Sequence, residues 1–151
     1  LNRYTTSKRN NTTIYCVIVS INENVETMRI FKFKGKSVDS SEWIEGYYYK
    51  ECDNTYIIED RQKDSVLNRN EAVLIEPSTV CMYTGLKDCE GNEIWEGDIL
   101  EGESKCEIVF FKGTFAIRYI NSNGKECVDP LHYFIKEDGT VECKVIGNIY
   151  D

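Results

Sequence analysis

Short apolar runs separated by glycine-containing turn pairs constrain this chain more than any other feature. Two of the runs, residues 29–34 and 114–120, alternate apolar and polar side chains, as half-buried strands do. Between runs lie Lys112-Gly113, Asn123-Gly124 and Asp138-Gly139. Gly, Asn and Asp tolerate the positive φ values of tight hairpin turns, and connections this short favour antiparallel neighbours. The pattern predicts an all-β fold, with residues 61–70 as either one short helix or an exposed loop.

A repeated segment indicates how the strands are organised. Residues 39–46, Asp-Ser-Ser-Glu-Trp-Ile-Glu-Gly, resemble residues 90–97, Glu-Gly-Asn-Glu-Ile-Trp-Glu-Gly. We interpret each copy as a tight hairpin whose second strand buries a tryptophan, Trp43 or Trp95, and then bends at the glycine. The repeat can be interpreted as two related β units that pack as one body, or as a coincidence of turn chemistry.

Charge and cysteine usage restrict the class of protein. The net charge of −8 disfavours nucleic-acid and anionic-lipid partners, unless a local basic patch overrides it. No apolar run is long enough for a membrane-spanning helix. The seven cysteines include no Cys-x-x-Cys pair and there is one histidine, so a structural zinc site is not expected. The odd cysteine count favours free thiols in a reducing cytoplasm, and we predict no metal or cofactor.

Residues suited to catalysis are sparse. His132 is the only histidine and lies between large apolar residues, so we interpret it as a strand residue that faces partly outward. The acidic residues Glu90, Glu93, Glu96 and Asp98 crowd one turn, but their spacing matches no recognised metal loop. We interpret them as a solvated turn and strand edge that resists aggregation. The sequence therefore predicts that the protein is not an enzyme.

Aromatic and basic residues give the best candidates for binding. In Tyr47-Tyr48-Tyr49, the middle ring should face the opposite side of a strand from its neighbours, so aromatic surface is expected on both sides. Exposed tyrosine beside charges is typical of protein interfaces and of single-stranded nucleic-acid platforms. Lys32, Lys34 and Lys36 alternate on one strand face, where they could form a basic patch or guard a sheet edge.

Four separated segments resemble the YopX family. Residues 77–100 contain Pro-x-Thr-Val, then Tyr-Thr-Gly-Leu-Lys-Asp, then Gly-x-Glu-Ile-Trp-Glu-Gly-Asp-Ile, with Trp95 where a tyrosine is common in the family. Residues 28–36, Met-Arg-Ile-Phe-Lys-Phe-Lys-Gly-Lys, resemble the start of the family, and Glu42-Trp43 follows them. The ending, residues 145–150, reads Val-Ile-Gly-Asn-Ile-Tyr. The resemblance implies an all-β fold of small barrel-like antiparallel units and a phage or prophage origin. It supplies no catalytic or binding residues.

The resemblance divides the chain into two parts. Residues 28–151 are expected to form the YopX-like domain, and residues 1–27 an N-terminal extension that is non-native or poorly ordered. The extension carries three basic and two acidic side chains, against 15 and 24 in the remainder. An upstream leader is one interpretation of this extension, and an added strand at residues 14–21 is the other.

These observations combine into one prediction of function. We expect a cytoplasmic, monomeric or weakly oligomeric protein-interaction module that acts on a host or phage protein. The predicted binding residues are Tyr47, Tyr48, Tyr49, Lys32, Lys34 and Lys36. An accessory protein that binds nucleic acid, or mimics it through the acidic surface, is the alternative.

Overall fold

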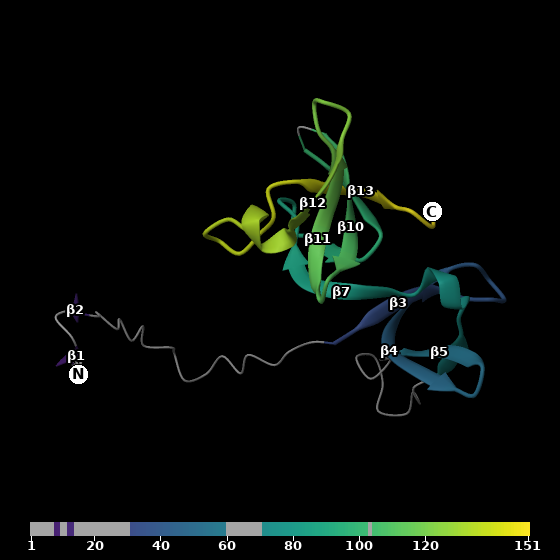
Figure 1. The fold of residues 1–151 in the computed structure, drawn as a ribbon. Coiled ribbons are helices and arrows are strands. Elements are labelled where there is room, and N and C mark those ends of the chain that lie inside the picture. The colour runs from purple at the N-terminus through teal and green to yellow at the C-terminus, as the bar shows by residue number, and fades with distance from the viewer. Residues whose placement is uncertain (1–7, 10–11, 14–30, 60–70, 103) are drawn as a thin grey trace.

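Two antiparallel sheets make up the body of the computed structural model (Figure 1), which describes residues 8–9, 12–13, 31–59, 71–102 and 104–151. The predicted all-β fold is confirmed, since the described residues form strands, turns and two short 3-10 helices. No helix in these ranges is long and apolar enough to cross a membrane. The predicted helix or loop at residues 61–70 and the predicted strand at 14–21 lie outside the described residues.

The first sheet is built from the N-terminal half of the body. Its six strands run in the order β6-β5-β4-β3-β7-β8. Their bounds are β3 (Phe33–Lys36), β4 (Trp43–Glu51), β5 (Asn54–Glu59), β6 (Ala72–Leu74), β7 (Cys81–Lys87) and β8 (Glu93–Trp95). A bridge between Ser37 and Ile75 joins the ends of β3 and β6, which are not neighbours in the sheet, so these strands curl without closing into a barrel. The short 3-10 helix η1 (Pro77–Thr79) leads into β7.

The second sheet follows in the sequence and has five strands in the order β12-β11-β10-β9-β13. The bounds are β9 (Asp98–Glu101), β10 (Lys105–Phe111), β11 (Thr114–Ile120), β12 (Glu126–Pro130) and β13 (Lys144–Asn148), with the 3-10 helix η2 (Leu131–Phe134) after β12. A separate pair, β1 (Lys8–Arg9) and β2 (Thr12–Thr13), lies near the N-terminus.

The glycine-containing pairs form the predicted turns. Lys112 and Gly113 both have positive φ, 51° and 84°, and join β10 to β11 directly, because Phe111 pairs with Thr114. This two-residue connection requires left-handed backbone at both positions, which glycine adopts without steric cost. The pairs Asn123-Gly124 and Asp138-Gly139 likewise lie in turns.

Buried side chains form two clusters. The larger draws most of its members from the second sheet and includes Ile94 from β8 of the first. Its residues are Ile94, Leu100, Cys106, Ile108, Ile117, Leu131 and Val141. The smaller contains Cys81, Tyr83 and Trp95, with Trp43 and Tyr150 packed against it. Because Tyr150 follows β13 while Trp43 begins β4, the smaller cluster joins the two sheets.

Two interpretations of the sequence need correction. The two sheets agree with the expected two β units, but the repeated segments do not mark one unit each, because Trp43 on β4 and Trp95 on β8 belong to the same sheet. Gly46 lies inside the nine-residue strand β4, while Gly97, with φ of 78°, separates β8 from β9, so only the second copy bends at its glycine. His132 lies in η2 rather than on a strand, although it is exposed as expected.

Candidate protein-binding surface

The three consecutive tyrosines lie on β4 and are all exposed, Tyr47 by 52%, Tyr48 by 42% and Tyr49 by 41%. The ring centroid of Tyr48 lies 5.4 Å from that of Phe33 on β3, whereas the Tyr49 centroid lies 6.0 Å from that of Tyr56 on β5. Tyr48 therefore faces the opposite side of the sheet from its neighbours, as strand alternation predicts.

One side of β4 carries two tyrosines with a glutamate at each end. Glu45, Tyr47, Tyr49 and Glu51 occupy alternate positions of the strand, and all four are exposed. Tyr56 on the neighbouring strand β5 pairs directly with Tyr49 and adds a third ring to this side. We call these five residues the tyrosine face. Because two carboxylates flank the rings, this surface suits a partner with positive charge.

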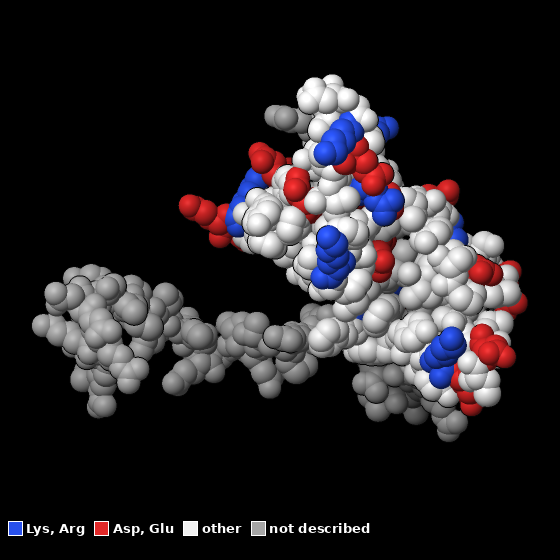
Figure 2. All heavy atoms as spheres, in the orientation of Figure 1, with Lys and Arg blue, Asp and Glu red and all other residues white. Residues whose placement is uncertain are grey.

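The three predicted lysines lie on or just before β3, where Lys34 pairs with Glu45 and Lys36 pairs with Trp43 of β4. Lys32 donates to both oxygens of Glu93 at 2.6 Å, and Lys34 donates to Asp98 at 3.1 Å. The ammonium nitrogen of Lys36 lies 5.3 Å from the Trp43 ring centroid. Carboxylates therefore offset the charges of Lys32 and Lys34. Across the visible face in Figure 2, basic and acidic side chains are interspersed.

Asp98 accepts hydrogen bonds from both sheets where they meet. It is 1% exposed, and its Oδ1 accepts hydrogen bonds from Lys34 at 3.1 Å and from Asn148 Nδ2 at 2.8 Å. Its Oδ2 accepts from the Trp95 backbone amide at 2.7 Å. The interpretation of Asp98 as part of a solvated edge is therefore wrong. Its three donors come from segments far apart in the sequence, so this carboxylate joins the two sheets.

Asp88, in the turn before β8, is a second buried carboxylate that joins the two sheets. Its side chain is fully buried and accepts from the backbone amides of Glu90, Asn92 and Val145 at 2.8–3.0 Å, as well as from the Asn92 amide side chain. Burial raises the pKa of Asp88, but the hydrogen bonds from Val145 and Asn92 outweigh it, so the net pKa is lowered. The carboxylate is thus held ionised by backbone donors.

The described cysteines are free thiols of differing burial, and the one histidine is exposed. Cys52, Cys81, Cys89, Cys106, Cys127 and Cys143 are free thiols. Burial raises the pKa of Cys81 and of Cys106 to about 11, so both remain protonated at neutral pH. The His132 ring is exposed, with its centroid 4.4 Å from that of Tyr133.

Sequence reasoning identified the aromatic residues but missed the buried polar ones. Asp88, Asp98 and Asn148 all lie within the segments that resemble the YopX family, and that resemblance was the one signal that could have pointed to them. The structure brings Asp98 and Asn148 together with Lys34, whereas the tyrosines lie further along β4.

Comparison with known proteins identifies the family of this chain. A search of curated proteins finds no match. The family model described as YopX protein matches residues 15–151 and so begins upstream of residue 28, where we expected the domain to start. Since the match spans most of the chain, this protein belongs to the YopX family.

Proposed function

We propose that this protein is a non-enzymatic interaction module whose tyrosine face binds a basic segment of a partner protein. The observation that carries the proposal is the alternation of Glu45, Tyr47, Tyr49 and Glu51 along one exposed side of β4. Tyrosine supplies a large contact area at a low cost in conformational entropy, and its ring attracts the cations of lysine and arginine.

Electrostatics favour a basic protein segment. Glu45 and Glu51 flank the rings, and the chain carries a net charge of −8. Such a field accelerates association with a positively charged surface and opposes association with a phosphate backbone. The ion pairs of Lys32 and Lys34 further reduce the basic charge available to nucleic acid.

The buried acidic groups support a role without catalysis. Asp88 and Asp98 accept hydrogen bonds from backbone and side-chain donors of the fold itself. Carboxylates held in this way stabilise a fold rather than transfer protons. Together with the implied phage or prophage origin, this favours a bacterial cytoplasmic or phage protein as the partner.

Replacing Tyr47 and Tyr49 together with alanine is expected to weaken partner binding by at least about tenfold, because aromatic anchors at interface centres each contribute about 2 kcal/mol or more. The measurement is affinity capture by the full chain from lysate of the cells that naturally make it, with and without nuclease treatment. Partners are quantified by mass spectrometry, and the dissociation constant is then measured with the purified partner.

The matched control is Tyr133→Ala, which removes an exposed tyrosine outside β4. We expect this variant to bind as the wild type does. Equal capture by the double variant would contradict the proposal, and so would recovery of nucleic acid alone. Mutual charge attraction also predicts that binding weakens as salt is raised.

A further inference from the structure

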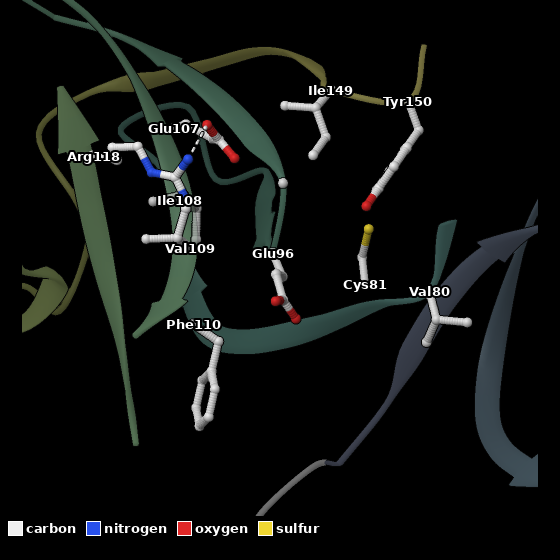
Figure 3. A pocket seen from close by; sticks show the side chains of 11 residues that line it. Val80, Cys81, Glu96, Glu107, Ile108, Val109, Phe110, Arg118, Ile149 and Tyr150 are labelled. Atoms are coloured by element: carbon white, nitrogen blue, oxygen red, sulfur yellow. Dashed lines mark ion pairs between the residues drawn. The ribbon is translucent and has the colours of Figure 1, made fainter. Parts of the chain in front are cut away.

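A small cavity lies at the junction of the two sheets (Figure 3). Its volume is about 200 Å³, whereas drug-sized ligands occupy pockets of about 300–1,000 Å³, so this cavity fits a single side chain. Its walls come from β7, β10 and β11, from the turn between β8 and β9, and from the residues after β13. The lining residues that matter here are Cys81, Glu96, Glu107, Phe110, Arg118 and Tyr150.

Negative charge in the cavity is incompletely balanced. Glu107 is paired with Arg118 across β10 and β11, but their closest N–O distance is 3.7 Å. No ion pair joins Glu96 to a lysine or arginine in the part of the chain that the structure describes. Burial raises the pKa of Glu96, and a hydrogen bond from the Met82 backbone offsets this only in part. A cation beside Glu96 would favour its charged form and so offset this desolvation penalty.

Two apolar residues that line the cavity are exposed. Phe110 is 54% exposed and Ile149 is 47% exposed, although both line the cavity. In the view of Figure 3, the Glu96 side chain appears between Phe110 and Tyr150. An aromatic ring beside a carboxylate suits arginine, since its planar guanidinium stacks on rings and its methylene stem packs against apolar surface.

We propose that this cavity accepts one arginine side chain of a partner protein, with the guanidinium beside the Glu96 carboxylate and the stem against Phe110. The protein origin of this side chain rests on the proposed interaction function. The cavity uses none of the residues of the tyrosine face, so it constitutes a second, separately testable contact.

The test uses the full chain labelled with ¹⁵N and titrated with N-acetyl-L-arginine amide. The neutral comparison probe is N-acetyl-L-citrulline amide, which has nearly the same shape. We expect the backbone amide signals of Gly97 and Val109 to shift with the arginine probe, and the citrulline probe to bind about tenfold more weakly. Glu96→Gln should weaken arginine binding by a similar factor, while the exposed control Glu101→Gln should not.

Acid should also weaken binding of the arginine probe. Glu96 must be ionised to attract the guanidinium, so binding is lost as pH falls through its raised pKa. Glu107 and Arg118 face the same cavity, and burial raises the pKa of both Cys81 and Tyr150, which therefore stay neutral. Glu96→Gln should show a flatter pH dependence than the wild type.

Three results would overturn the proposal: no shifts up to about 50 mM probe, equal binding of the two probes by the wild type, or unchanged binding by Glu96→Gln. The probe comparison on the wild type does not depend on the folding of any variant. The variant lacking Tyr47 and Tyr49 should bind the arginine probe normally. Failure of partner binding at the tyrosine face and failure of arginine binding in the cavity can therefore be told apart.

Discussion

Replacing Asp98 with alanine is expected to lower the free energy of unfolding by about 3–5 kcal/mol, the usual cost of breaking a buried ion pair from one side. The change leaves the Lys34 ammonium without its carboxylate in a position where only 13% of that side chain is exposed. It also leaves Asn148 Nδ2 and the Trp95 amide without this acceptor. Urea unfolding followed by tryptophan fluorescence measures the loss.

Fluorescence suits this measurement because both tryptophans lie around the same lysine. The Lys34 ammonium nitrogen is 4.8 Å from the Trp43 ring centroid and 5.3 Å from that of Trp95. The matched control is Glu101→Ala, which removes an exposed carboxylate from the same strand, β9, and should change stability by less than about 1 kcal/mol. A loss of that small size for Asp98→Ala would show that the pair does not join the sheets.

Replacing Asp88 with alanine is expected to cost about 3 kcal/mol, because buried backbone donors lose a charged acceptor. It should also change the acid response. The folded pKa of Asp88 lies below its ordinary value of 3.8, so its contribution is present above pH 3.8 and is lost as pH falls through the folded pKa. The variant should therefore lose less stability than the wild type on acidification below pH 3.8.

The control for Asp88 comes from the same turn. Glu90→Ala removes a carboxylate that pairs with Lys144 at 2.9 Å on the exposed surface, where solvent screening leaves the contact little effect on stability. Urea unfolding at neutral pH and at several acidic pH values compares the three proteins. Parallel acid profiles for Asp88→Ala and the wild type would contradict the assigned role of Asp88.

Local features of the fold were predictable from sequence because their causes are local. The Lys112-Gly113 hairpin depends on backbone conformation at two adjacent residues, and alternation along β4 fixed the opposite orientation of Tyr48. The buried state of Asp98 depends instead on Lys34 and Asn148, which lie 64 and 50 residues away. Nothing in an acidic turn distinguishes a solvated carboxylate from one that such distant donors will cover.

The repeat could not show which sheet each copy joins, for a related reason. Residues 39–46 and 90–97 share turn chemistry and a tryptophan, which suggested two related β units or a coincidence of turn chemistry. Strand pairing instead places both tryptophans in one sheet, where Trp95 forms a cluster with Cys81 and Tyr83, and Trp43 packs against that cluster. Similar local sequence was thus used twice within one sheet, because pairing partners are set by the whole chain rather than by the turn.

Site-specific photo-crosslinking shows which molecules contact the tyrosine face. A photoreactive phenylalanine analogue replaces Tyr49 in one protein and Tyr133 in another, and each is irradiated in lysate of the cells that naturally make the protein. We predict that position 49, but not position 133, crosslinks to one partner protein through a segment rich in lysine and arginine. Crosslinks from position 49 to nucleic acid alone, or to the same proteins as position 133, would contradict it.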